Sequence, residues 1–64
     1  MSESLSGEEI LHIFREIHHG RGNHGSFLRS LAITIISADY ENFELLRPAA
    51  EQIITKYQLQ EYLD

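Results

Sequence analysis

Apolar side chains recur at helical spacing in three segments of this chain, and this period is what most limits the folds open to it. In the first segment the positions i, i+3, i+4 and i+7 are occupied by Ile10, Ile13, Phe14 and Ile17. Ser6 and Glu9 precede this run in the order of a capping box, so we expect a helix to begin there. Gly20 and Gly22 predict its end, in a connection over residues 20–25 that is not helical throughout.

A second helix is predicted to start at Gly25 or Ser26 and to run to about Ala38. Its apolar residues spread over roughly half of the circumference at about 100° per residue; they are Phe27, Leu28, Leu31, Ala32, Ile35 and Ile36. Either this helix is the central element of the domain or it also packs against another chain. The β-branched residues 33–36 also suit a strand, but helix is preferred because no second strand is available for pairing.

A third helix is predicted to be capped by Asp39, with Asn42 at its third position. Its apolar stripe consists of Phe43, Leu46, Ala50, Ile53, Ile54 and Tyr57. Pro48 lacks an amide donor, so we expect the helix to be kinked or split there. The same pattern continues in Leu59, Tyr62 and Leu63, which we expect to dock on the body of the protein or on a neighbouring subunit. The predicted fold class is all-α, a small three-helix domain.

The chain has 64 residues and no cysteine, which predicts one helical domain over residues 1–64 with a disordered terminus over residues 1–5. A chain this short buries only about 60% of the surface that it exposes when unfolded. Neither disulfides nor a zinc cluster are available to staple it, so we predict a homo-oligomer. We find no signal peptide and no apolar run that could span a bilayer, which predicts a cytoplasmic protein.

Charge is distributed unevenly along the sequence. Five Lys and Arg residues against ten Asp and Glu residues give a net charge of −5, which argues against binding to bulk nucleic acid or to an anionic membrane. Residues 12–30 nevertheless hold three arginines (Arg15, Arg21 and Arg29) against one glutamate (Glu16), a net charge of +2, together with all four histidines. An acidic protein thus gathers its cationic groups around one glycine-rich connection.

These groups predict an anion-binding site at the start of the second helix. Free backbone amides and the positive end of the helix dipole favour a phosphate or a carboxylate there, and arginine grips phosphate through two parallel hydrogen bonds. The predicted site comprises Asn23, His24, Gly25, Ser26 and Arg29, with Arg21, His19 and Arg47 as outer cationic contacts. The plainer alternative is an ordinary interhelical turn in which Ser26 is the N-cap.

Metal binding and catalysis are weaker interpretations of the same residues. His12, Glu16 and His19 share one helical face and offer ligands for zinc, but a solvated polar face explains them equally well. Two pairs have the composition of a catalytic base and its partner, namely His24 with Ser26 and His19 with Asp39. Nothing in the sequence fixes a triad, and a chain this small does not readily build a dry pocket. We therefore predict no enzyme activity, no metal and no cofactor.

Several apolar and aromatic residues are candidates for an interface, namely Phe27, Ile33, Tyr40 and Tyr62. Phe43 and Tyr57 lie at helical spacing and are predicted to belong to the core. A negative face is formed by Glu41, Glu44, Glu51, Glu61 and Asp64. This face is either a solubilising surface or a mimic of nucleic-acid charge.

Three sequence motifs resemble short uncharacterised proteins of tailed bacteriophages. They are HGxFLR at residues 24–29, ADxENFxLLRPA at residues 38–49 and KYxL at residues 56–59. The resembling stretch runs from Asn23 to Leu59 and covers a little over half of the chain. Relatives often carry proline where this chain has Tyr40. The resemblance implies a protein of the host cytoplasm that acts by binding, either by sequestering a nucleotide signal of an antiviral defence system or by blocking a host protein.

The favoured interpretation is a homo-oligomer that sequesters a phosphorylated small molecule, such as a cyclic nucleotide, without catalysis. Its expected partners are therefore further copies of itself and that ligand, with no membrane and no bulk nucleic acid. The alternative is a protein-binding inhibitor or adaptor of a host protein, including one that mimics nucleic acid. That alternative relies on the interface residues and the acidic face.

Overall fold

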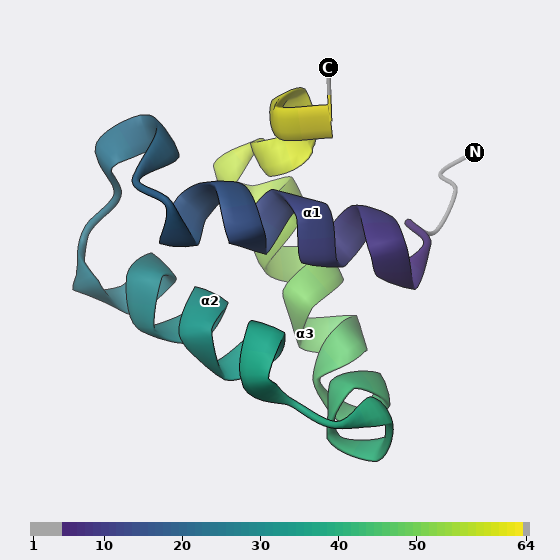
Figure 1. The fold of residues 1–64 in the computed structure, drawn as a ribbon. Helices are drawn as coiled ribbons and strands as arrows, with labels where there is room; N and C mark the ends of the chain where they lie inside the picture. Colours follow the sequence, from purple (N-terminus) through teal and green to yellow (C-terminus); the bar gives the residue numbers. More distant parts are fainter. Residues whose placement is uncertain (1–4, 64) are drawn as a thin grey trace.

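The computed structural model describes residues 5–63 and arranges them as three α-helices and two short 3₁₀ helices (Figure 1). In chain order these are α1 (Gly7–His18), η1 (Arg21–Asn23), α2 (Ser26–Ser37), α3 (Tyr40–Tyr57) and η2 (Leu59–Leu63). The predicted all-α, three-helix class is confirmed for these residues, none of which lies in a strand. Within the same range no helix has the length and apolarity needed to cross a bilayer. Of the predicted disordered terminus, residues 1–4 lie outside the described range and Leu5 packs half-buried against the core.

α1 is the central element and packs against α2, α3, η1 and η2. Its predicted apolar face is confirmed, because no residue of it is more than 1% exposed: Ile10, Ile13, Phe14 and Ile17. The capping box is also confirmed, since the Glu9 amide donates to Ser6 Oγ (3.1 Å) and the Ser6 amide donates to Glu9 Oε1 (2.9 Å). The alternative that placed the second helix at the centre of the domain does not hold.

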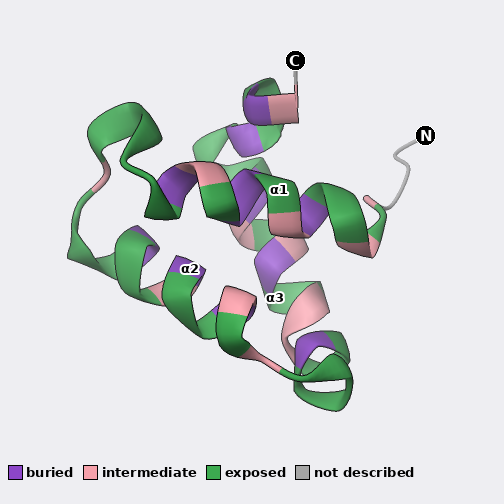
Figure 2. Ribbon diagram, viewed as in Figure 1, coloured by how far each residue is buried: buried purple, intermediate pink, exposed green. Residues whose placement is uncertain are grey.

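α2 is a helix, as preferred over a strand, and it buries a narrower face than the sequence predicts. Leu28, Ala32 and Ile35 are buried against the core, whereas Phe27 is 56% exposed. Most of the outer surface of α2 is exposed (Figure 2). At about 100° per residue, Phe27 and Ala32 lie on different sides of the helix, and α1 does not cover the side of Phe27. Gly25, and not Ser26, is the N-cap, and the cap makes no side-chain hydrogen bond.

α3 begins at the predicted cap, where the amide of Asn42 donates to Asp39 Oδ1 over 2.8 Å. The helix continues unbroken through Pro48, so the split form of the prediction is wrong. Pro48 and Glu44 are both exposed, so water can replace the hydrogen bond that the missing amide of Pro48 would have donated. α3 buries Phe43, Ala50 and Ile54.

η2 folds back onto α1 and completes the core. Leu59 is 1% exposed and Tyr62 is 6% exposed, which confirms that the C-terminal residues dock on the body. Tyr57 was expected in the core but is 42% exposed. It is the last residue of α3, and Gln58 after it adopts a left-handed conformation (φ 58°) that ends the helix. The Cα radius of gyration is 10.8 Å, close to the value of about 11 Å for a compact chain of this length.

Candidate functional site

The arginine at the start of the glycine-rich connection contacts its own chain. Arg21 Nη1 donates to Glu16 Oε1 over 2.9 Å and to the carbonyl oxygen of Tyr62 over 3.4 Å. The Arg21 guanidinium carbon also lies 4.5 Å from the centroid of the Tyr62 ring, within the range of a cation–π contact. Arg21 therefore helps to hold the C-terminal turn, through Nη1 and the face of its guanidinium.

Two histidines complete the contacts of the same tyrosine. His24 Nε2 lies 2.6 Å from Tyr62 Oη, and His12 Nε2 lies 3.1 Å from the Tyr62 carbonyl oxygen. We call the residues that surround this ring the Tyr62 cluster; they are His12, Glu16, Arg21, His24 and Tyr62. Tyr62 was predicted as an interface residue, but its ring is buried within its own chain by these contacts.

Gly22 shows how closely the connection approaches this cluster. Its φ of 81° lies in the left-handed region, which glycine adopts without a steric cost. A Cβ atom at this position would also lie only 2.0 Å from Tyr62 Oη and 2.6 Å from His24 Nε2. The glycine is thus required both by the turn and by the tyrosine that packs on it.

Within the cluster, Arg21 lowers the pKa of the Glu16 carboxyl below its ordinary value. The hydrogen bond from the Arg21 guanidinium is the largest cause, and partial desolvation opposes it. The positive charge of Arg21 adds to the lowering, with smaller contributions from His12 and His19. Glu16 is therefore a charged partner of Arg21, and this pairing accounts for a residue that could otherwise be read as a metal ligand.

The remaining residues of the predicted anion site lie around the start of α2 and just after α1. All of them are exposed: Asn23, Gly25, Ser26 and Arg29 in this segment, and His19 at the end of α1. No side chain caps this helix and its first turn holds no carboxylate, whereas α1 and α3 are capped and carry glutamates in their first turns. Free amides and Arg29 therefore remain available for an anion at this one helix start.

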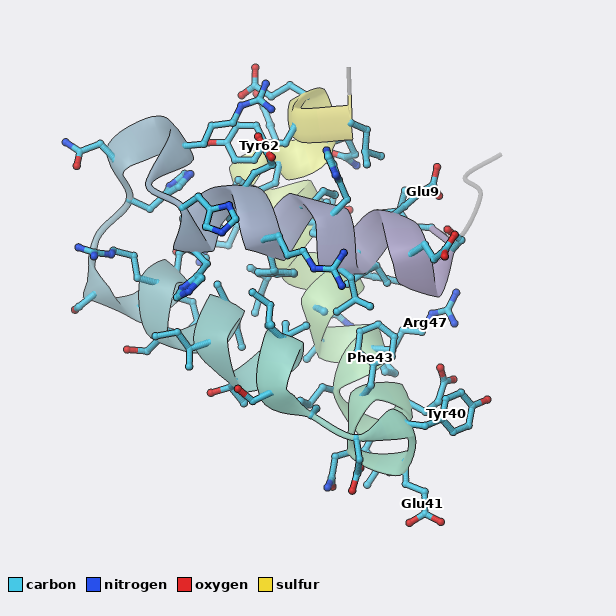
Figure 3. The ribbon with its side chains drawn as sticks, viewed as in Figure 1. Glu9, Tyr40, Glu41, Phe43, Arg47 and Tyr62 are labelled. Carbon is cyan, nitrogen blue, oxygen red and sulfur yellow. The ribbon has the colours of Figure 1, made fainter. Side chains whose placement is uncertain are left out.

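Arg47 does not join this group. Its Nη2 donates to the carbonyl oxygen of Leu5, and it forms ion pairs of 3.4 Å with Glu44 and with Glu51. Figure 3 shows Arg47 at the end of the molecule where α1 begins, away from Tyr62. The prediction that Arg47 serves as an outer contact of the anion site does not hold, because α3 brings it to the start of α1 instead.

A surface hollow lies beside Arg47, between the first turns of α1 and α3. It has a volume of about 460 Å³. We call it the Tyr40 hollow, and its lining residues are Ser6, Gly7, Glu8, Leu11, Tyr40, Phe43, Glu44 and Arg47. Tyr40 is 78% exposed and projects from it, with Glu41 next to it on α3 (Figure 3). The hollow thus combines an exposed aromatic side chain with two carboxylates, Glu8 and Glu44, of which Glu44 is paired with Arg47.

This hollow was not predicted as a site, although Tyr40, Glu44 and Arg47 were each predicted to have a different role. The sequence does contain the two helix starts that form the hollow, because Ser6 and Asp39 are both caps that are followed by acidic residues. What the pattern did not reveal is that the fold brings these two helix starts together. That proximity depends on the tertiary packing of α3 against α1.

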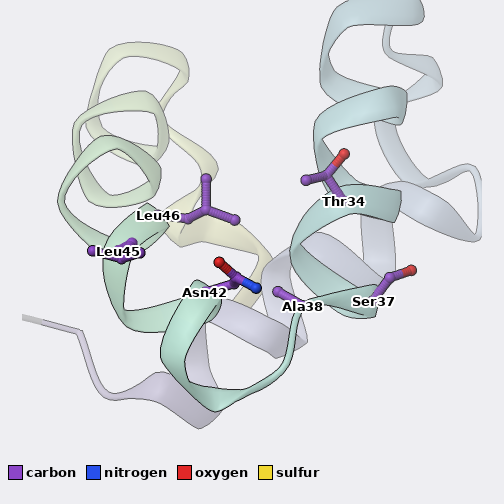
Figure 4. Close-up of a pocket in the computed structure, with 6 residues that line it drawn as sticks. All are labelled: Thr34, Ser37, Ala38, Asn42, Leu45 and Leu46. Carbon is purple, nitrogen blue, oxygen red and sulfur yellow. The ribbon is translucent and has the colours of Figure 1, made fainter.

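A second hollow, of about 530 Å³, lies on the other side of α3 where α2 and α3 diverge (Figure 4). We call it the α2–α3 groove, and it is lined by Thr34, Ser37, Ala38, Asn42, Leu45 and Leu46. Leu45 is 78% exposed at its edge, and none of the lining residues carries a charge. The groove is therefore an apolar surface that the chain itself leaves uncovered.

The interpretations as a metal site or a catalytic centre gain no supporting geometry. Across residues 5–63, no three His, Asp or Glu side chains are grouped so that they could hold a metal ion. His24 directs Nε2 to Tyr62 and not to Ser26.

Comparison of the chain with protein-family models, with curated proteins and with solved structures finds no match. The resemblance to bacteriophage proteins therefore stays a prediction.

Proposed function

We propose that this chain is a non-enzymatic binding protein whose Tyr40 hollow receives a basic segment of another protein. The observation that carries the proposal is the exposure of Tyr40, 78%, at the mouth of a hollow with carboxylates on its rim. In keeping with the bacteriophage resemblance, the proposed partner is a host protein that this chain inhibits or recruits.

The chemistry of the hollow favours such a partner. A tyrosine offers a large rigid contact area at a low cost in side-chain entropy, which is why tyrosines are frequent at the energetic centres of interfaces. Glu8, Glu44 and Arg47 line the hollow, and because Arg47 pairs with Glu44, Glu8 is the carboxylate that attracts a Lys or Arg of the partner. An incoming guanidinium can stack on the Tyr40 ring.

A capture experiment tests the proposal. Immobilised wild-type protein and the variant Tyr40→Ala are incubated with bacterial lysate, and the retained proteins are identified by mass spectrometry. Tyr57→Ala is the matched control, because Tyr57 is also exposed on α3 but does not line the hollow. We expect one protein to be retained by the wild type and the control, lost with Tyr40→Ala and released by salt. Equal retention by Tyr40→Ala would contradict the proposal.

A second candidate function is favoured by the uncapped start of α2. We propose as an alternative that a phosphorylated small molecule, such as a nucleotide immune signal, is sequestered by the amides after Gly25 together with Arg29. Calorimetry with cyclic dinucleotides and ADP-ribose derivatives tests this alternative. Heat should be lost with Arg29→Ala but not with Arg15→Ala, and the ligand should be recovered intact after the protein is denatured. Absence of heat with all of these compounds would remove this candidate.

A further inference from the structure

The outer side of α2 carries a line of exposed residues that its own chain does not cover. They follow one another at intervals of three, four and three residues, the repeat that keeps side chains along one seam of a helix: Phe27, Ser30, Thr34 and Ser37. Phe27, the bulky member, is 56% exposed at one end of this seam. The buried residues Leu28, Ala32 and Ile35 lie toward α1, on a different side of the helix.

The α2–α3 groove lies at the other end of the same seam. Thr34 and Ser37 form one of its walls, and Leu45 and Leu46 of α3 form the other (Figure 4). One end of the seam thus projects an aromatic side chain, and the other end offers an apolar groove. A surface of this kind is complementary to itself when one copy is turned around.

We propose that the groove is filled by a second copy of this chain, in a two-fold dimer whose α2 helices run antiparallel. The two-fold axis crosses the seam at the level of residue 32 along the helix, so that Phe27 of each copy lies opposite Ser37 of the other, at its groove. Ser30 of each copy then lies opposite Thr34 of the other. Ile33, which is 50% exposed beside the seam, comes close to its own counterpart near the axis.

Charge complementarity favours the antiparallel arrangement. The seam carries no charged residue although the chain has a net charge of −5, so two copies can meet there without like-charge repulsion. The N-terminal end of α2 has the positive end of the helix dipole, no carboxylate in its first turn and Arg29 nearby. Beyond its C-terminal end lie the exposed carboxylates of Asp39 and Glu41. Antiparallel pairing places these unlike ends side by side.

The dimer does not depend on the proposed function. At about 100° per residue, Leu45 of the groove lies on the opposite side of α3 from Tyr40 and Arg47 of the Tyr40 hollow, and Leu46 lies about 100–120° from them. Pairing through the groove therefore leaves the hollow open. Failure of the dimer leaves capture through Tyr40 untouched, and failure of capture leaves the dimer untouched.

Sedimentation velocity of the full chain tests the dimer. The wild type should sediment at about twice the chain mass of 7.4 kDa at micromolar concentration. Two variants, Ser30→Glu with Thr34→Glu and Ser30→Lys with Thr34→Lys, place like charges opposite each other across the seam. Each should be a monomer alone, whereas an equimolar mixture should regain the doubled mass, because every glutamate then faces a lysine. Both positions are exposed, so the helical circular dichroism should be retained.

Three results would overturn the proposal: a monomeric wild type, a charged variant that keeps the doubled mass, or folded variants that stay monomeric when mixed. If a charged variant loses its helical signal, Phe27→Ala decides the question. This variant should be monomeric, and the exposed-aromatic control Tyr57→Ala should remain a dimer. A doubled mass for Phe27→Ala contradicts the proposal.

Crosslinking tests the register, since the chain has no native cysteine. Ser30→Cys and Thr34→Cys chains are mixed and oxidised. Antiparallel pairing with the axis at the level of residue 32 predicts mainly the mixed disulfide, because these two positions face each other. A predominance of disulfides between identical chains would indicate a parallel register and would overturn the arrangement.

Discussion

Removing one oxygen atom from Tyr62 tests how firmly the glycine-rich connection holds the C-terminal turn. In Tyr62→Phe the ring stays in place, and so does its stacking with Arg21, but the 2.6 Å contact between Tyr62 Oη and His24 Nε2 is lost. A hydrogen bond of this kind contributes about 0.5–1.5 kcal/mol to the free energy of unfolding, and the half-buried His24 ring is left without its partner. We therefore expect a loss of about 1 kcal/mol.

This loss is a measurable share of the stability that a chain of this size possesses. At roughly 0.05–0.15 kcal/mol per residue, the whole protein is stabilised by about 3–10 kcal/mol. A loss of about 1 kcal/mol should lower the midpoint of thermal unfolding by roughly 4–8 °C. Because self-association would make unfolding depend on concentration, all variants are compared at one protein concentration.

Urea unfolding followed by circular dichroism supplies the free energies. The matched control is Tyr57→Phe, which removes a hydroxyl from a tyrosine that is 42% exposed and should leave the stability within about 0.5 kcal/mol of the wild type. A double-mutant cycle with His24→Ala should give a coupling energy of about 1 kcal/mol. Equal stability of Tyr62→Phe and the wild type, or a coupling energy of zero, would refute the role assigned to this pair.

Three further outcomes follow from the same contacts. Because the pKa of Glu16 is lowered, its ion pair with Arg21 stabilises the protein fully above the unfolded value of 4.5, and this stabilisation is lost as the pH falls through the folded value. The difference in free energy of unfolding between wild type and Glu16→Gln should therefore shrink below about pH 4.5. A difference that stays constant with pH would be inconsistent with the pairing. Gly22→Ala should lower the free energy of unfolding by at least roughly 1–2 kcal/mol, the cost of an alanine in the left-handed conformation, because the new methyl group also meets Tyr62 Oη. Unchanged urea unfolding would count against this geometry. Asp39→Ala should lower the free energy of unfolding by about 1 kcal/mol, because it removes the cap of α3. Asp39→Asn keeps an accepting oxygen and should retain most of that stability. An equal loss in both variants would disprove the cap.

The helices themselves could be predicted from the sequence because their determinants are local. Ser6 with Glu9 and Asp39 with Asn42 are three residues apart, so the hydrogen bonds that fix both helix starts are visible in the pattern. The apolar spacing of α1 correctly gave its buried face. The prediction for Pro48 failed in part, because an exposed position lets water replace the missing hydrogen bond and the helix survives.

The candidate sites could not be predicted in the same way, because they depend on residues far apart in the chain. His24 and Tyr62 are separated by 38 positions, and nothing near His24 indicates that its ring is used by the last turn. Arg47 was placed at the wrong end because the direction in which α3 returns is not encoded locally. Phe27 was expected to share the apolar arc of α2, yet α1 covers only part of that arc.

The central proposal is that another protein is recognised at the Tyr40 hollow. Tyr62 already engages Arg21 and His24 of the glycine-rich connection within the chain. Titration of ¹⁵N-labelled protein with a hexa-arginine peptide tests the central proposal most directly, because every amide reports its own surface. We predict saturable shifts at Gly7, Glu8, Tyr40 and Glu44, which disappear in Tyr40→Ala. Shifts spread evenly over all exposed carboxylates, or no shifts at all, would contradict the proposal.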